Sequence, residues 1–327
     1  MNFSQLKIAV KDYITAGGGQ NTVINSDTFW SDSEIKLALN NAQKQLYNII
    51  RRARRDFFTR ILRSTDSSLV INGQTFTPSS LAWVSGTGNY TLPPDFVRMK
   101  LITDLSDDRI RMVWGDIATN AFRVLMNSDA SNTAREYLWD ILGIRTLLVR
   151  PIPQEARDFE FIYEKLLATM REWQTGTLSL TNASTTGTFN AAADIQNRLV
   201  VGDEIIIGTS ASAQSTADPN EVYPVVKSID SSTQITLAGP YLGTTVSGFA
   251  YTASSVSEIP AQHHELLILI AAQILFKKGT NPSGDAAAEC QERIDALMPD
   301  LIGDVEIRQG SDNEYVQAYL EDQEGFN

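Results

Sequence analysis

The residues best suited to acid–base or metal chemistry are the two histidines of the chain, His263 and His264, which stand side by side before Glu265. Neighbouring residues on a helix point about 100° apart, so the two imidazoles cannot both face one ion. The zinc-protease pattern needs a second histidine four residues after the first, and the sequence lacks it. We therefore interpret these residues as the polar N-terminus of a helix.

The remaining reactive groups also favour structural roles. The single cysteine, Cys290, shares an apolar helical stripe with Ile294 and Leu297, which favours a buried, inert thiol. One cysteine excludes an internal disulfide framework, and no spacing of carboxylates singles out an acid–base pair. The sequence therefore predicts no catalytic residue, no metal ligand and no cofactor, and we expect a protein that is not an enzyme.

Charge is spread unevenly along the 327 residues, whose formal net charge is −12. Residues 1–172 carry 21 basic and 19 acidic side chains, whereas residues 257–327 carry 4 and 14. A freely diffusing nucleic-acid binder is normally basic, so this balance counts against that class. The longest apolar run, Leu266–Phe276, is far shorter than the about 20 residues that a bilayer requires, and no secretory pattern opens the chain. We expect a protein that stays in the cytoplasm where it is made, or in a particle assembled there.

The first candidate binding group is a run of arginines behind a capped helix start. Ser31–Glu34 is a capping box, and apolar residues at spacings of three and four continue to Ile61, which predicts one helix over Asp32–Arg63. Arginine favours bidentate recognition of carboxylate or phosphate, so a partner-binding face is an alternative to a merely solvated one. The acidic C-terminal region is a candidate counterpart, within one chain or between subunits. The arginine set consists of Arg51, Arg52, Arg54, Arg55, Arg60 and Arg63.

The second candidate binding group is the acidic tail, residues 304–327. It contains seven acidic residues, the lone base Arg308 and three spaced aromatic residues. A segment with so little apolar surface cannot fold alone, which predicts that the tail becomes ordered on a partner. Its carboxylates would pair with arginines there, while its aromatic rings would fill pockets. The candidate residues are Asp312, Glu314, Tyr315, Tyr319, Glu321, Asp322 and Phe326.

The elements that must position these groups predict an α+β fold. Two strands, Leu147–Arg150 and Phe159–Tyr163, are separated by a Pro-x-Pro turn, which indicates a small antiparallel β meander. Residues 173–256 show short strands divided by turns, as is typical of a small barrel or sandwich, and helical patterns return at 259–278 and 283–301. The predicted domains are a helical core with the meander (1–172 and 257–303), an inserted all-β domain (173–256) and an acidic C-terminal tail (304–327).

Five short motifs follow one another along the chain: Trp30–Ile35, Tyr90–Phe96, Leu148–Pro153, Phe161–Tyr163 and Ile259–Leu267. In this order they resemble the head-to-tail adaptors of tailed phages, the neck or tail tubular proteins that sit beneath the portal. The resemblance covers Asp27–Tyr163 and Glu258–Lys278, whereas residues 173–257 depart from the simpler pattern.

The resemblance implies a structural virion protein of the neck, assembled in the host cytoplasm. It implies a homo-oligomeric ring of about twelve copies under the portal that joins the portal to the tail and lines the DNA channel. The implied partners are the portal protein above, to which the C-terminal extension docks, and a tail or nozzle protein below, with no membrane. Double-stranded DNA would pass without sequence-specific binding, and an acidic chain that repels phosphates suits such a conduit.

The inserted β domain supports an alternative function. In that alternative the protein anchors a fibre or a decoration on the virion, and residues 173–256 are the main binding module. The size of the purified assembly separates the two functions, because a ring of about twelve subunits indicates the adaptor and a trimer indicates the fibre anchor.

Overall fold

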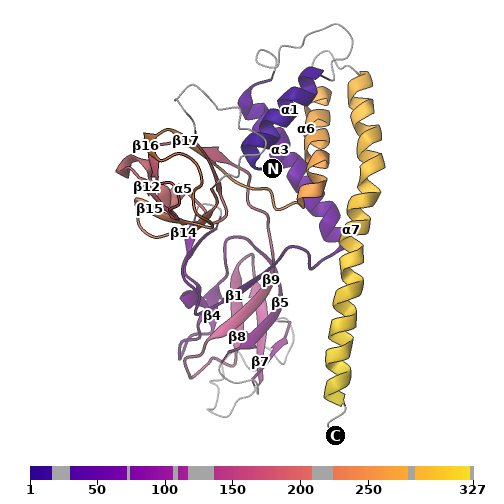
Figure 1. Ribbon diagram of the computed structural model, residues 1–327. Coiled ribbons are helices and arrows are strands. Elements are labelled where there is room, and N and C mark those ends of the chain that lie inside the picture. Colours follow the sequence, from indigo (N-terminus) through magenta and orange to yellow (C-terminus); the bar gives the residue numbers. More distant parts are fainter. Residues whose placement is uncertain are drawn as a thin grey trace. The chain divides into compact units, whose positions relative to one another are not determined.

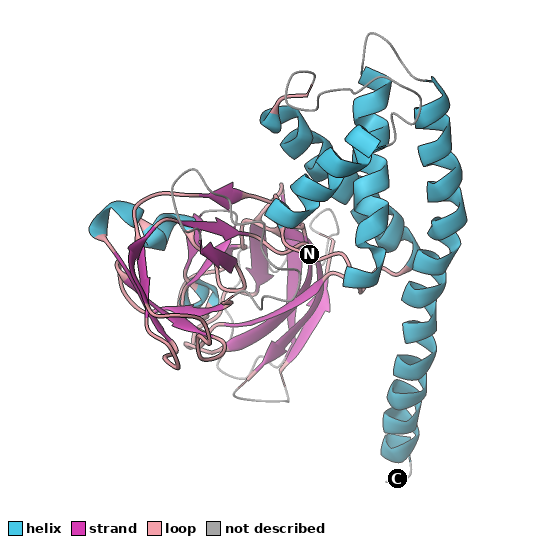
Figure 2. Ribbon diagram, turned by 45° about the horizontal axis from the view of Figure 1, so that its top comes forward, coloured by secondary structure: helices cyan, strands magenta, loops and turns pink. Residues whose placement is uncertain are grey.

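The computed structural model describes residues 1–16, 30–71, 74–105, 110–116, 136–207, 224–278 and 284–324, and in the last helix it describes side chains from Ala286 to Glu306. Helices and antiparallel sheets are both present, so the predicted α+β class is confirmed (Figures 1 and 2). The chain forms two compact units. Unit 1 comprises Met1–Phe57 and Thr169–Asn327, and unit 2 comprises Phe58–Ala168. The domain boundaries that the sequence suggests remain a prediction.

The described part of unit 1 contains four long helices that pack together (Figure 1). They are α1 (Phe3–Ala16), α3 (Asp32–Ala53), α6 (His264–Lys278) and α7 (Gly284–Glu324). The predicted capping box opens α3: the Ser31 hydroxyl accepts from the Glu34 backbone N–H, and the Glu34 carboxylate accepts from the Ser31 N–H. Helix α6 is apolar nearly all round because α1, α3 and α7 all pack against it.

The predicted helix over Asp32–Arg63 is wrong in its second half. Helix α3 ends at Ala53, where Arg54 turns into an extended conformation, and Thr59–Arg63 forms strand β1. The strand is favoured because Leu62 enters the core of unit 2 while all five residues pair with a neighbouring strand. The arginine set therefore does not share one helical face.

The last helix is longer than predicted. Helix α7 continues through Gly303 to Glu324, so its 41 residues span about 60 Å. A glycine inside a helix costs only about 1 kcal/mol, and the buried side chains of Leu301 and Val305 on either side of Gly303 offset that cost. Residues 325–327 lie outside the described residues, and ordering of the tail on a partner remains a prediction.

Residues 172–254 of unit 1 form two antiparallel sheets around one core. Leu178, Phe189 and Ile235 from the larger sheet meet Ile205 and Tyr251 from the smaller one, so the described strands build a sandwich and not a closed barrel. The smaller sheet has the order β10 (Glu172–Trp173), β17 (Tyr251–Ser254), β13 (Glu204–Ile207). The larger has the order β14 (Val226–Ile229), β15 (Gln234–Leu237), β12 (Thr186–Phe189), β11 (Leu178–Leu180), β16 (Val246–Phe249). The short helix α5 (Ile195–Arg198) lies between β12 and β13 in sequence.

Unit 2 holds two sheets and a small hairpin, β2 (Leu69–Ile71) with β3 (Gln74–Phe76). One sheet has the order β1, β9 (Phe159–Lys165), β5 (Phe96–Asp104). The other has the order β4 (Asn89–Thr91), β8 (Thr146–Arg150), β7 (Glu136–Leu142), β6 (Arg111–Trp114), in which β6 runs parallel to β7.

The predicted pairing of Leu147–Arg150 with Phe159–Tyr163 is wrong, because β8 and β9 belong to different sheets. The physical reason is the core between the sheets, in which the Trp83 ring lies 4.2 Å from the Phe159 ring and 4.6 Å from the Tyr137 ring. Rings of this size need a sheet on each side to be covered, which a single meander does not provide.

Candidate functional site

The predicted arginine set is divided between the two units. Arg51 and Arg52 lie in the last turn of α3, where cations also stabilise the helix end. Arg54 is buried and its Nε pairs with Asp56 at 3.0 Å, whereas Arg55 is exposed. The arginines at the α3 end that remain partly or fully exposed are therefore Arg51, Arg52 and Arg55.

The two arginines on β1 are paired with carboxylates of unit 2. Arg60 lies 2.7 Å from the carboxylate of Asp95, which is buried and also accepts from the Tyr163 hydroxyl at 2.9 Å. Burial raises the pKa of Asp95, and the nearby Arg60 opposes that shift. Arg63 Nε lies 2.7 Å from Glu160 on β9, with its side chain more than half exposed. Arg60 is thus committed to the fold, while Arg63 lies at the surface.

The tail residues predicted to bind a partner, Asp312 to Phe326, lie outside the described side chains, so their contacts stay a prediction. The first acid of the tail is described. Asp304 accepts from the Gln262 amide at 3.1 Å and lies 3.0 Å from His263 Nε2, within the wall of an open pocket of about 500 Å³. Asp304 therefore belongs to the helical bundle.

The histidines predicted to begin a helix do so, and both are buried. His263 ends a short 3-10 turn (Ala261–His263) and His264 opens α6. His264 Nε2 donates to the Ile259 carbonyl at 3.0 Å, while Nδ1 faces the Met1 amino group at 2.9 Å, which suits a neutral ring. Burial, followed by the positive Met1 amino group, lowers the pKa of His264. Across the described residues, no group of three potential metal ligands is brought together.

Cys290 is buried, as its place on the apolar stripe predicts. Its Sγ lies 3.7 Å from the Tyr13 hydroxyl, and burial raises the pKa of the thiol. A thiol whose pKa is raised is a poor nucleophile, so this position supports packing of α7 against α1.

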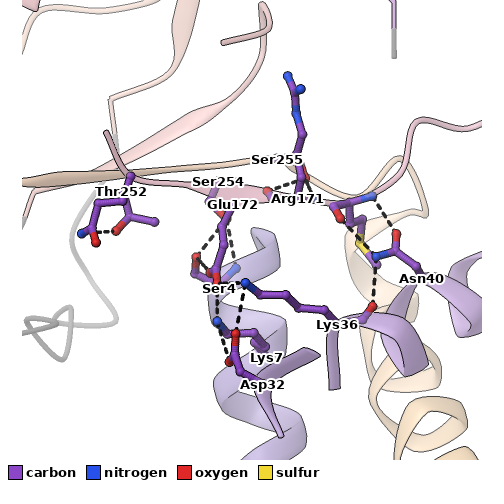
Figure 3. A network of polar contacts seen from close by, with 12 residues as sticks. Ser4, Lys7, Asp32, Lys36, Asn40, Arg171, Glu172, Thr252, Ser254 and Ser255 are labelled. Carbon is purple, nitrogen blue, oxygen red and sulfur yellow. Dashed lines mark hydrogen bonds and ion pairs between the residues drawn. The ribbon is translucent and has the colours of Figure 1, made fainter. Parts of the chain in front are cut away.

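A polar junction that the sequence did not reveal joins α1, α3 and β10 (Figure 3). We define it as Lys7, Asp32, Lys36 and Glu172. Lys7 forms ion pairs with Glu172 and, at 2.9 Å, with Asp32. Lys36 lies 2.9 Å from Glu172 and 3.0 Å from Asp32, so each cation is shared by both carboxylates.

The junction is stabilised by charge pairing despite its burial. The side chain of Lys7 is 7% exposed and that of Glu172 is 13% exposed. Burial disfavours the Glu172 carboxylate, but hydrogen bonds from Lys7 and Lys36 outweigh that cost, so the pKa of Glu172 lies below its usual value. Burial and the same two lysines act on Asp32, with a lowered pKa as the result. Removal of one member would leave an uncompensated charge in a poorly solvated place.

Backbone contacts beside the junction hold the β sandwich to the helices. The Asn40 amide of α3 donates to the Met170 carbonyl at 3.1 Å and accepts from the Met170 N–H at 2.8 Å. The Phe3 N–H donates to the Ser255 carbonyl at 2.9 Å, and the Ser4 hydroxyl donates to Glu172 at 2.7 Å. The strands that enter and leave the sandwich are thus bonded to α1 and α3.

One sequence signal could have found this junction. Lys7 falls on the helical stripe of Phe3, Val10 and Ile14, all of which are buried, and a lysine in such a stripe needs a buried acid. Its partner Glu172 lies 165 residues away, and no local pattern identifies it.

The charged groups described above thus hold neighbouring elements of the chain together. In the comparison with protein families, the model of the SU10 adaptor protein matches residues 1–194. The chain belongs to the SU10 adaptor protein family and is therefore an adaptor-type structural component of a phage particle. No curated protein matches the chain in sequence. Within the described ranges, no helix has the length and apolar character needed to cross a membrane.

Proposed function

We propose that the protein is a head-to-tail adaptor, whose copies form a ring under the portal, join it to the tail and surround the DNA channel. The observation that carries the proposal is the family match over residues 1–194, which includes α1, α3 and all of unit 2. The net charge of −12 supports a channel role, because DNA phosphates slide past an acidic wall without binding it.

Portal attachment is assigned to Arg51, Arg52 and Arg55 at the end of α3. These three lie together at the end of α3 and are partly or fully exposed, whereas Arg54 is buried, Arg60 is held at the buried Asp95, and Arg63 lies on β1 of unit 2. Surface arginines at a helix end present planar donors that suit carboxylates of a partner protein. The acidic tail is the second assembly element, and we propose that it leaves its own subunit.

Electron microscopy of the purified protein, alone and mixed with its portal, tests the function. We expect rings of about twelve subunits that sit on the portal, and charge reversal at Arg51, Arg52 and Arg55 together should abolish attachment. Rings that attach normally with all three charges reversed would contradict the arginine assignment. A protein that stays monomeric with and without the portal would contradict the adaptor function itself.

The alternative function, in which residues 173–256 anchor a fibre or a decoration, is supported by a separate observation. The family match ends at residue 194, so most of the sandwich lies beyond it, and the sandwich has a core of its own. Replacement of Gln174–Ser255 by a short linker separates the functions. Rings that persist while virions lose a fibre or a decoration would assign the binding module to the sandwich, and a trimeric purified protein would favour the alternative as a whole.

A further inference from the structure

The three-stranded sheet of unit 2 carries an apolar row on its outer face. Leu62, Ile102 and Phe161 point into the core, so the residues that alternate with them face outward. In the strand register, Ile61 of β1 lies opposite Ile162 of β9, and Ile162 lies opposite Leu101 of β5. Ile61 is 59% exposed and Leu101 is 49% exposed. Three apolar side chains thus cross the whole sheet, over about 10 Å from edge to edge.

Basic side chains border this row on both sides. On one side Arg63 lies opposite Glu160, and on the other Arg98 lies opposite Glu164. The Lys100 ammonium reaches across the sheet to the Thr59 hydroxyl at 2.8 Å. Arg98 is exposed, whereas Glu164 is buried, so the accessible charge around the row is mainly positive. An apolar row with a basic border fits an acidic amphipathic helix.

The end of α7 matches that description. The bundle helices α3 and α6 have 22 and 15 residues, or about 33 and 22 Å, and are too short to cover the about 60 Å of α7 (Figure 1). In the sequence, Tyr315, Val316, Tyr319 and Leu320 have the spacing of one helical face, and residues 312–324 carry five acidic side chains and no basic one. An isolated helix of about 18 residues is only marginally stable in water, so a partner surface would stabilise the end of α7.

We propose that residues 312–324 of α7 from one copy dock on the outer face of β1, β9 and β5 of a second copy. The inference rests on the proposed function and deepens it, because it names the receptor of the tail. The two surfaces lie on different elements of the chain, so the contact can repeat head-to-tail around the ring of the proposed function. The portal, which the family resemblance implies as the receptor, is then not the docking site of this segment.

Disulfide trapping between two chains, each with one introduced cysteine, tests the proposal. Ile61→Cys and Leu320→Cys chains are co-assembled and oxidised, with the native Cys290 buried in both. We expect a cross-linked dimer from the mixture, lost on reduction, and none from either chain assembled alone. A third chain carries both Ile61→Cys and Leu320→Cys. A cross-link that forms only within this chain, so that the oxidised product migrates as a monomer, would overturn docking on a second copy. Rings that form without any cross-link would overturn the inference and leave the adaptor function standing, whereas the absence of rings and of cross-links would overturn both.

Protease protection supplies a second measurement that does not depend on introduced cysteines. A Glu-specific protease cuts within the docked segment, and Leu101→Asp should raise the rate of that cleavage in assembled rings by about tenfold, since it removes one buried apolar contact. Val84→Asp is the matched control, because Val84 is 57% exposed in the same unit but lies outside the three strands. Equal cleavage in both variants, or protection that requires the portal, would overturn the proposal.

Discussion

The polar junction of unit 1 and the arginines on β1 of unit 2 use their ion pairs differently. In the junction, two lysines and two carboxylates form one shared network that bonds the sandwich to α1 and α3, with Lys7 and Glu172 buried and Asp32 and Lys36 partly exposed. In unit 2, Arg60 and Arg63 on the same strand each pair with a carboxylate of their own, and the Arg63 side chain stays more than half exposed. The difference separates charges that hold the fold from charges that remain available to a partner, and the following variants test that separation.

The largest expected effect is that of Lys7→Met. The substitution leaves Glu172 buried with one cation fewer, and breaking a buried pair in this way costs about 3 kcal/mol. Hydrogen exchange measured by mass spectrometry should show amides of α1 exchanging roughly a hundredfold faster. The double variant Lys7→Met with Glu172→Met should recover part of the loss, because no unpaired charge remains. A double variant that is less stable than the single one would contradict the network.

The next effect is that of Arg60→Ala in unit 2, for which we expect a loss of about 2 kcal/mol in urea unfolding. The buried carboxylate of Asp95 would lose its nearby guanidinium and keep the hydrogen bond from the Tyr163 hydroxyl. Arg63→Ala is the matched control on the same strand, with an expected change within about 0.5 kcal/mol, since its pair is exposed. Equal losses of unfolding free energy in Arg60→Ala and Arg63→Ala would contradict the distinction between a buried and an exposed ion pair.

A smaller effect, of opposite sign, is expected at Asp203. Burial raises the pKa of Asp203 to about 6, with Arg171 at 3.9 Å only partly opposing the shift. A carboxyl group whose folded pKa is raised costs stability in full above that pKa, and the cost decreases as the pH falls from about 6 towards the ordinary value of 3.8. Asp203→Asn should therefore stabilise the protein by about 1 kcal/mol at pH 7 and by much less at pH 4.

Glu172 provides the contrast in the same pH series. Its folded pKa is lowered, so the stability that it contributes is present at neutral pH and is lost as the pH falls below about 4.5 towards the folded pKa. Thermal unfolding of Asp203→Asn and Glu172→Gln between pH 3 and 7 measures both signs. Parallel pH profiles for the two variants would show that the two carboxylates do not differ as described.

The smallest effect on stability is expected for Arg52→Glu at the exposed end of α3, within about 0.5 kcal/mol. Its effect on portal attachment should be larger, because reversal of a charge in an interface opposes the partner. Thermal unfolding and portal binding are measured on the same preparation, so that the change in stability can be compared with the change in attachment. If Arg52→Glu lowers the thermal stability but leaves portal attachment unchanged, Arg52 stabilises the fold and does not bind the portal.

Sequence patterns predicted those elements whose structure is determined by residues close together in the sequence. The capping box at Ser31, the buried helix α6 and the buried thiol of Cys290 follow from residues within a few positions of each other. The end of α3 was not predictable in this way, because Ile61 continues the helical spacing of the apolar residues. In the structure Ile61 is exposed and its neighbour Leu62 is buried, because pairing with β9 replaces the helical period by an alternating one.

The candidate site was predicted only in part for the same reason. The sequence identifies the six arginines by type, but whether each is available to a partner depends on acids such as Asp95 and Glu160, which lie on other strands. The polar junction depends on a contact between Lys7 and Glu172, and its backbone bonds depend on residues near 255. Contacts over such separations are set by the tertiary fold, which a single sequence does not display.

The bond between the Phe3 N–H and the Ser255 carbonyl has a consequence for the order in which the protein is made. At roughly 5–20 residues per second, a ribosome needs on the order of ten to fifty seconds to pass from one to the other. Unit 2 is one uninterrupted stretch, Phe58–Ala168, and its last strand emerges long before that time. The apolar face of α1 is therefore synthesised long before β17 and α6, and it lacks these neighbours until they have been translated.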